Sequence, residues 1–380
     1  MINQFIRFVR EQYRTDQFIP LHAPVFSGRE RDYVMETIDS TFVSSVGAFV
    51  DRFEADTAAY TGSPRAVATV NGTAALHMAL MLVGVEPGDL VLTQALTFVA
   101  TCNAIAYCRA EPGFIDVDRD TLGLSPSALC AWLEEHAVVD AQGLCRTRSD
   151  HKVVRACVPM YTFGHPAHID GLVAVCAQWN IALVEDAAES LGSFYKGRHT
   201  GTFGRVGILS YNGNKIITTG GGGMILTSEA LGARAKYLTT TAKRPHPYEF
   251  FHDEVGYNYR MPNLNAALGC AQMEQLEQFV ASKRVLAGRY AELFAGSEFA
   301  FVTEPAGCRS NYWLNAVICE NLARRDALLE TSNAAGVMTR PIWQLMNRLP
   351  SYKQCRHGDL SNSLWLAERV VNLPSSLIEG

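Results

Sequence analysis

Residues 206–224 read VGILSYNGNKIITTGGGGM, an apolar run followed by a polar loop that carries Lys215 and four consecutive glycines. The apolar run 206–210 predicts a buried strand. A position just after a buried strand is unusual for a lysine whose charge is exposed to solvent. Desolvation lowers the pKa of a lysine and frees the neutral amine that a Schiff base requires. The stretch therefore indicates either a reactive Lys215 or a surface lysine in a flexible loop.

The same loop offers groups for a phosphate. Ser210 supplies a hydroxyl, and the glycines 220–223 let backbone and ligand approach closely. A dinucleotide-binding turn is the alternative, but no GxGxxG follows an early strand. We therefore favour a phosphate site of another kind.

The strand before Lys215 is one of a series. Apolar runs without polar alternation, each followed by a helix-length segment, indicate a mainly parallel sheet buried on both faces. The runs are 65–70, 90–94, 113–117, 153–159, 181–184 and 206–210. In such sheets ligands bind beyond the carboxyl ends of the strands.

The rhythm of strand and helix breaks after residue 227. A helix over 228–240 and a polar stretch over 243–256 come first, then one long helical pattern over 264–294, and then shorter strands and helices. We predict an N-terminal helix in residues 1–19, a large α/β domain over 20–255 and a smaller α+β domain over 256–380.

Asn71-Gly72-Thr73-Ala74 leaves the first predicted strand and opens a helix. The free N–H groups and dipole of a helix start bind anions, which suits a phosphate ester. The alternative is a tight turn with Thr73 as the N-cap.

Two adjacent carboxylates, Glu185 and Asp186, close the run 181–184. A carboxylate here could hold a protonated ring nitrogen, bind a metal or cap a helix. No histidine or cysteine stands nearby at ligand spacing, so we predict no metal.

Composition excludes several classes of protein. A net charge of −5 gives no basic footprint for nucleic acid. No stretch reaches the roughly 18 apolar residues of a membrane span, and residues 1–14 lack the apolar core of a signal peptide, so we expect a cytoplasmic protein. The ten cysteines form no CxxC pair or zinc pattern, and we expect no disulfide.

One cofactor needs all these pieces together. Pyridoxal phosphate (PLP) requires a lysine for its aldehyde, a carboxylate for its pyridinium nitrogen, a phosphate cradle and an aromatic face. Phe98, at the start of a predicted helix, is a candidate for that face, with core packing as its alternative. The stretch 256–262 reads by composition as a polar turn before a helix.

The chain resembles the nucleotide-sugar aminotransferases of the DegT/StrS type, which are fold-type I PLP enzymes. The resemblance runs from PLHAPVFSG (20–28) to LPSS (373–376). It is carried by NGTAAL (71–76), LTFVAT (96–101), YTFGHP (161–166), VEDAAESLG (184–192), SYNGNKIITTGGGGM (210–224) and GYNYRMPNLNAALG (256–269). It implies a large domain with a mainly parallel sheet between helices and a smaller α+β C-terminal domain.

The resemblance also implies roles for single residues. Lys215 would bind the PLP aldehyde and Asp186 the pyridine nitrogen. Asn258 would reach the phosphate of the neighbouring subunit, which implies a homodimer with shared active sites. Further cofactor contacts would come from Gly72, Thr73, Ala74, Phe98, Ser210 and Glu189, the last at a position often filled by Gln or His. Substrate contacts would come from Ser44, Ser45 and Arg340.

Within this family the stretches 42–54 and 212–224 are most similar to the 4-aminotransferases of legionaminic-acid-type pathways. These move an amino group from L-glutamate to a UDP-linked 4-keto-6-deoxy-N-acetylglucosamine used for bacterial surface glycans. Two alternatives stay open. A PLP-dependent sugar dehydratase of the same fold would have histidine in place of Lys215, and a catalytically silent regulatory or binding protein would not need Lys215 and Asp186.

Overall fold

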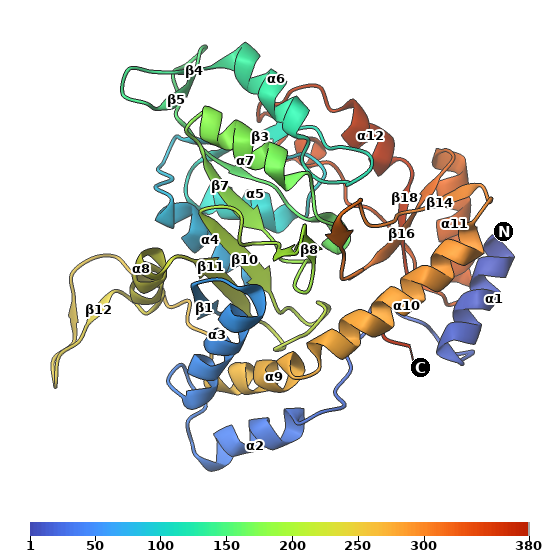
Figure 1. The fold of residues 1–380 in the computed structure, drawn as a ribbon, viewed down its shortest axis with the longest axis horizontal. Coiled ribbons are helices and arrows are strands. Elements are labelled where there is room, and N and C mark those ends of the chain that lie inside the picture. The colour runs from blue at the N-terminus through green and yellow to red at the C-terminus, as the bar shows by residue number, and fades with distance from the viewer. Residues whose placement is uncertain (379–380) are drawn as a thin grey trace.

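The computed structural model describes residues 1–378 and has a seven-stranded sheet at its centre (Figure 1). The order of the strands is β1-β11-β10-β7-β6-β2-β3. Their bounds are β1 Arg65–Thr69, β2 Leu90–Gln94, β3 Glu111–Ile115, β6 Val154–Val158, β7 Ala182–Asp186, β10 Val206–Ser210 and β11 Gly223–Thr227. Each predicted apolar run forms a strand of this sheet.

All these strands run in one direction except β11, which is antiparallel to both β1 and β10. The mainly parallel sheet is confirmed, and the reversed strand was not predicted. The segment 211–222 between β10 and β11 contains no crossover helix, and the chain returns antiparallel beside β10. A Cβ on Gly223 would lie 2.5 Å from the carbonyl oxygen of Asn71, so this close approach requires glycine.

Both faces of the sheet are buried, as the continuous apolar runs indicate. Alternate residues such as Val184 and Ile208 pack on one face, whereas Leu183 and Leu209 pack on the other. The first face is covered by α4 (Gly72–Leu82), α5 (Val99–Tyr107) and α8 (Glu229–Thr239). The second is covered by α3 (Ala48–Thr61), α6 (Pro126–His136), α7 (Ile169–Gln178) and α9 (Asn263–Met273).

A second, antiparallel sheet lies toward the C-terminal end of the chain. Its order is β14-β16-β18-β17, with bounds β14 Phe299–Phe301, β16 Asn315–Cys319, β18 Val370–Leu373 and β17 Arg340–Pro341. Around it lie α1 (Ile2–Tyr13), α11 (Leu322–Ala334) and α12 (Ser361–Ala367) (Figure 1). Phe5 and Val9 of α1 pack in one apolar cluster with Leu328 of α11.

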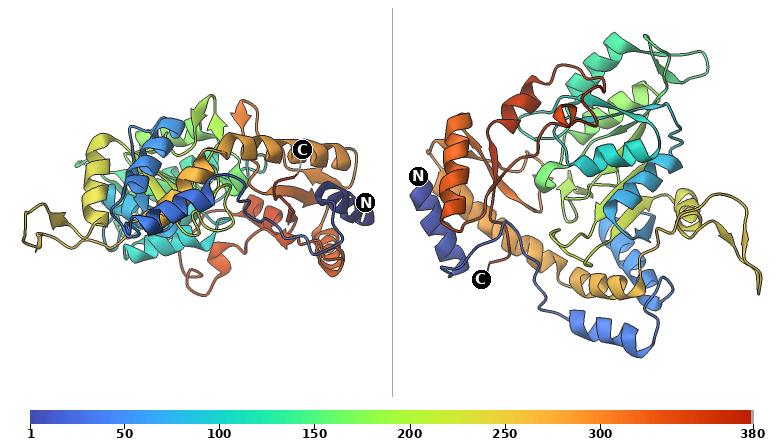
Figure 2. Two further views of the ribbon diagram at one scale, coloured as in Figure 1. Left: turned by 90° about the horizontal axis from the view of Figure 1, so that it is seen from below. Right: turned by 180° about the vertical axis from the view of Figure 1, so that it is seen from behind.

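The helix predicted over 264–294 is two helices, α9 and α10 (Leu276–Phe294). The break falls at Gln275, whose side-chain amide donates to Glu30 of α2 (Glu30–Asp39) at 2.7 Å. No proline or glycine marks this break, so periodicity could not show it. Figures 1 and 2 show α10 crossing from the central sheet to the C-terminal sheet, whereas α9 packs against α2 and α3. The domain boundary at residue 256 stays a prediction.

A hairpin of β12 (Lys243–Arg244) and β13 (Phe251–His252) projects from the body of the molecule (Figures 1 and 2). Its exposed apolar side chains are Tyr248, Phe250, Phe251 and Val255. The remaining strands are β4 Ala137–Val139, β5 Cys145–Thr147, β8 Phe194–Tyr195, β9 Arg198–His199 and β15 Cys308–Arg309. Short 3-10 helices cover Thr162–Gly164 and Met346–Arg348.

Two further observations concern the described residues. Within residues 1–378, none of the helices combines the length and apolar character that a membrane span needs. The ten cysteines all lie in this part of the chain and are free.

Candidate active site

A cavity of about 650 Å³ lies beyond the carboxyl ends of β1, β2, β7 and β10. These ends share one edge because the four strands run in the same direction. The sheet side of the cavity is lined by Gly72, Thr73, Phe98, Asp186, Glu189, Ser210 and Lys215. The opposite side is lined by Trp313, Leu314, Arg340, Ile342, Trp343 and Gln344. One cavity therefore joins most of the predicted site residues.

Lys215 extends from the β10–β11 loop into this cavity, with only 12% of its side chain exposed. Its Nζ lies 3.4 Å from Oε1 of Glu189 and 4.0 Å from the centre of the Trp313 ring. The loop is held because the Lys215 N–H donates to the Asn212 carbonyl at 3.0 Å. A surface lysine in a flexible loop, the alternative interpretation, is therefore wrong.

Asp186 ends β7 and is buried. Its carboxylate accepts hydrogen bonds from the Thr101 hydroxyl at 2.7 Å and the Ala188 N–H at 3.2 Å. Burial raises the pKa of Asp186, and these two donors together with the Lys215 charge oppose that rise. A cationic ring nitrogen beside Asp186 would favour its ionised form further. The helix-cap interpretation is wrong because a turn, not a helix, follows β7.

Glu185 faces away from its neighbour, because successive side chains of a strand alternate. Its carboxylate accepts from the N–H groups of Gly201 at 2.8 Å and Gly204 at 2.5 Å, and from the Tyr161 hydroxyl. Glu185 thus ties the 201–204 loop to the sheet. Of the two adjacent carboxylates, only Asp186 lines the cavity.

The start of α4 forms the candidate phosphate cradle. Asn71 is the N-cap, and its side-chain oxygen accepts from the Ala74 N–H at 2.8 Å, so the prediction of Thr73 as the cap is wrong. The N–H groups of Gly72 and Thr73 cannot be bonded within the helix, and both residues line the cavity beside Ser210. A Cβ on Gly72 would lie 2.9 Å from the Ser210 Cβ, which requires glycine here.

Phe98 and Glu189 also line the cavity. Phe98 is 49% exposed and lines the cavity, so core packing, its alternative, is wrong. Glu189 is buried, and its Oε2 accepts from the Phe163 N–H at 2.9 Å. Burial raises the pKa of Glu189, and the Lys215 charge opposes that rise.

Some predicted residues lie elsewhere within the chain. Arg340 lines the cavity. Ala74 does not line it but directly follows Thr73, which does. Ser44, Ser45 and Asn258 do not line it. Ser45 borders a second cavity of about 740 Å³ together with Arg260. Asn258 pairs through its backbone with Thr240. A single chain does not bring these three residues to Lys215.

The structure also adds residues that the sequence did not single out. Thr101 holds Asp186 from the first turn of α5, and Trp313 and Trp343 form the wall opposite the sheet. Thr101 lies in the quoted LTFVAT motif, three residues after Phe98, so its place near Phe98 was readable but its partner was not. The two tryptophans carried no signal, because isolated tryptophans are ordinary core residues.

These residues fit PLP. One cavity contains Lys215, the carboxylate of Asp186 and the ring of Phe98. The start of α4 at Gly72, where a side chain would not fit, lines the same cavity. The cavity volume is in the range for cofactor sites. PLP, when bound, supplies an electron sink for a substrate carbon. Lys215 is the group in this cavity that can exchange a proton with that carbon.

The fold and the cavity together define a fold-type I PLP-dependent aminotransferase. The chain belongs to the DegT/DnrJ/EryC1/StrS aminotransferase family, whose model matches residues 25–377. It is similar to EpsN of Bacillus subtilis, with 37% identity over 88% of this chain and 84% of EpsN. It is 35% identical to the GDP-perosamine synthase of Caulobacter vibrioides over 94% of this chain and 93% of that protein.

A solved structure shows the same fold. The aminotransferase TlmJ of Streptoalloteichus hindustanus superposes with a TM-score of 0.85 and 27% identity, over 94% of this chain and 93% of TlmJ. The expected family, fold class and cofactor are therefore confirmed.

Proposed function

We propose that the protein transfers an amino group from L-glutamate to C4 of a nucleotide-linked 4-keto-6-deoxy sugar, in the cytoplasm, for a bacterial surface glycan. A UDP-linked N-acetylated sugar is the proposed acceptor. The observation that carries the proposal is that Lys215, with 12% of its side chain exposed, and the buried Asp186 line one cavity in a chain from this family.

Each residue has a role in this proposal. Lys215 would hold the cofactor aldehyde until the donor amine takes its place, and its Nζ would then move the proton between the substrate carbon and the cofactor carbon. Asp186 keeps the ring nitrogen protonated, while Gly72, Thr73 and Ser210 hold the phosphate. Phe98 covers the ring. Arg340, at the cavity wall, contacts substrate.

The second cavity supports a nucleotide substrate and a homodimer. Its lining carries four cationic side chains and a single carboxylate. The cations are Lys236, Lys243, Arg244 and Arg260. Two of the cations are paired with carboxylates outside the lining, Lys236 with Glu54 and Arg244 with Asp253, so Lys243 and Arg260 are the candidates to bind a diphosphate. Within residues 1–378, the buried Nε of Arg260 has no hydrogen-bond partner. In a dimer whose Asn258 segment faced the partner's Lys215 cavity, this basic cavity and Ser45 would adjoin the same site.

A GDP-linked acceptor is the second candidate. Relatives from Caulobacter vibrioides, Escherichia coli O157:H7 and Vibrio cholerae, each named GDP-perosamine synthase, are 33–35% identical to this chain. These names support a GDP-linked sugar as the alternative acceptor.

Two other activities are disfavoured by the same residues. A dehydratase of this fold would lack the lysine that Lys215 provides. A silent binding protein would have no use for the pair of Lys215 and Asp186.

The test offers UDP-, GDP- and dTDP-linked 4-keto-6-deoxy sugars with L-glutamate and identifies products by mass spectrometry. We expect the amino-sugar of the UDP-linked N-acetylated compound together with 2-oxoglutarate. Amination of the GDP sugar alone would establish the second candidate, and loss of a hydroxyl without amination would establish a dehydratase. Borohydride reduction should fix PLP on Lys215, and fixation on another lysine would overturn the assigned role.

A further inference from the structure

Trp313 contacts the amine that the proposed chemistry uses. We propose that Trp313 is a positioning residue, whose indole face acts together with the Glu189 carboxylate to hold the ammonium form of Lys215. This inference rests on the proposed role of Lys215 and assigns a function to a part of the cavity wall that the proposed function leaves unused.

The two contacts act on the same atom. The Lys215 Nζ lies 4.0 Å from the centre of the Trp313 ring and 3.4 Å from Oε1 of Glu189. An indole face and a carboxylate both attract a cation and gain nothing comparable from a neutral amine.

The indole also fixes the backbone next to the lysine. Its Nε1–H donates to the carbonyl of Asn214 at 2.6 Å. Asn214 directly precedes Lys215, so the same side chain sets the lysine's backbone and its amine. This double contact distinguishes Trp313 from Trp343, which packs its ring against Phe163 in the same cavity.

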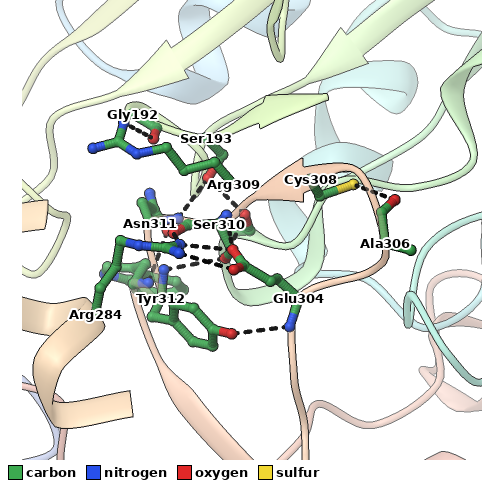
Figure 3. A network of polar contacts seen from close by, with 12 residues as sticks. Gly192, Ser193, Arg284, Glu304, Ala306, Cys308, Arg309, Ser310, Asn311 and Tyr312 are labelled. Atoms are coloured by element: carbon green, nitrogen blue, oxygen red, sulfur yellow. Dashed lines mark hydrogen bonds and ion pairs between the residues drawn. The ribbon is translucent and has the colours of Figure 1, made fainter. Parts of the chain in front are cut away.

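A strained turn places Trp313 there. The preceding residue, Tyr312, has φ of 46°, which is rare for a bulky side chain and persists only where surrounding contacts enforce it. The Tyr312 N–H donates to the Ser310 hydroxyl at 3.1 Å, and the Tyr312 hydroxyl accepts from the Glu304 N–H at 3.0 Å. Figure 3 shows this network, in which Arg284 pairs with Glu304.

Asn311 connects the two groups that contact the lysine. Its side-chain oxygen accepts from the Trp313 N–H at 2.8 Å, and its amide donates to the Glu189 carbonyl at 2.9 Å. Asn311 is fully buried (0% exposed), and Gly164 faces it without a side chain, because a Cβ there would lie 1.9 Å from the Asn311 oxygen. Trp313 and Glu189 are therefore fixed relative to each other.

A buried lysine, Lys283, binds the backbone carbonyl of Trp313. Lys283 of α10 is fully buried, and its Nζ donates to the Trp313 carbonyl at 3.1 Å and to the Ser375 carbonyl. Burial lowers the pKa of Lys283 to about 7. No carboxylate pairs with it within residues 1–378, so its hydrogen bonds go to these two carbonyls.

The consequence concerns one proton. When Lys215 takes the proton from the donor carbon, the C–H bond breaks, its electron pair stays on the substrate side, and Nζ becomes an ammonium. Trp313 and Glu189 stabilise that ammonium, which would pass the proton to the cofactor carbon within the same half of the cycle. In the second half the direction reverses, and the ammonium held by the same two residues would give a proton to the acceptor carbon.

The test uses the full chain loaded with pyridoxamine phosphate, in which Lys215 carries no cofactor. Lys215 is labelled with acetic anhydride across a pH series, and the modified lysine is quantified by mass spectrometry. Only the neutral amine reacts, so the midpoint of the profile reports the ammonium, whereas the plateau at high pH reports access. In Trp313→Leu we expect the midpoint at lower pH and labelling at neutral pH about three- to tenfold faster.

Three further variants complete the design. Trp313→Phe keeps an aromatic face and should shift the midpoint less, although it loses the bond to Asn214, and Glu189→Gln should shift it in the same direction as Trp313→Leu. Trp365→Leu is the matched control, because Trp365 lies on α12 under Arg119 and Arg369. We expect it to keep the wild-type profile, and thermal melting shows whether each variant is folded.

A change in plateau without a change in midpoint for Trp313→Leu would overturn the inference, as would an equal shift in Trp365→Leu. If Trp313→Leu does not fold, Trp313→Phe and Glu189→Gln decide, and an unshifted midpoint in both overturns it. Failure of the proposed function shows separately, because borohydride would then fix PLP on a lysine other than Lys215.

Discussion

The Lys215 cavity and the Ser45 cavity are built in opposite ways. Around Lys215 the polar groups are buried and bonded to one another within the chain, as in the Thr101–Asp186 and Asn311–Glu189 contacts. Around Ser45 and the β12–β13 hairpin many side chains are exposed, including those of the hairpin itself. Large apolar residues there have no cover: Phe42, Val43, Val46, Tyr248, Phe250 and Phe251 are exposed by 44–82%.

The difference separates chemistry from binding. Bond making needs groups held rigidly by their own scaffold, whereas a binding surface can be completed by association. We therefore expect substitutions near Lys215 to impair the active site of their own subunit. Substitutions near Asn258 should instead impair the active site of the neighbouring subunit.

The largest expected effect is that of Lys215→Ala, which should abolish transamination while the fold persists. Within residues 1–378 no other lysine lines the cavity, so none of these residues replaces the amine. Amino-sugar formation and thermal melting measure the two outcomes. Lys353→Ala, at an exposed lysine, is the control. Turnover close to wild type in Lys215→Ala would end the assignment of the lysine.

Asp186→Asn should lower turnover by about a hundredfold while some PLP still binds, because its role is electrostatic. Removing the charge lets the pyridine nitrogen deprotonate. Glu185→Gln is the matched neighbour, and it should lower the melting temperature with turnover per folded molecule nearly unchanged. If Asp186→Asn lowers the melting temperature and leaves turnover nearly unchanged, as expected for Glu185→Gln, then the two faces of β7 do not differ in function.

Asn258→Ala should weaken PLP binding by about ten- to a hundredfold, because a charged phosphate loses one donor, worth roughly 1.5–3 kcal/mol. Titration of the chain with PLP, followed by absorbance, measures it. An unchanged affinity with a lowered melting temperature would make Asn258 a structural residue only.

Mixing Lys215→Ala chains with Asn258→Ala chains tests which subunit Asn258 serves. In a shared-site dimer one site collects both lesions and the other is intact, so activity should recover to about half per mixed dimer. If mixed dimers form without recovery beyond the parent variants, both residues act in the same subunit, and the contrast drawn between the two cavities is wrong.

The smallest expected effect is that of Thr101→Val, which removes one donor to Asp186. The ionised carboxylate is then less stable, so the pKa of Asp186 rises further. The acid limb of the activity profile should move to higher pH by about half a unit to one unit, from roughly 1 kcal/mol per hydrogen bond. Thr97→Val, the hydroxyl that contacts Thr101 rather than Asp186, is the control.

Local sequence predicted the sheet and the pieces at its edge, because apolar runs and turn glycines act over short distances. The runs became strands, and Lys215, Asp186, Gly72 and Ser210 met in one cavity. What failed depended on distant partners. The break at Gln275 follows from its bond to Glu30, and the place of Trp313 follows from Asn311 and Lys283.

Which of Glu185 and Asp186 lines the cavity could be predicted only in part. Alternation along a strand requires them to face opposite sides, but sequence alone does not say which side holds the cavity. Only the register of β7 against β10 places Asp186 on the side of Lys215.

The reversed strand β11 has a consequence for how the protein is made. The Lys215 loop is closed by β11, which pairs with β1 from Arg65↔Thr227 to Thr69↔Gly223. A growing chain therefore carries its lysine out of the ribosome before the strand that fixes it has emerged. Because such long-range pairing forms slowly, capture of PLP must wait until the sheet is closed. Cofactor capture during synthesis would thus report the closure of the central sheet.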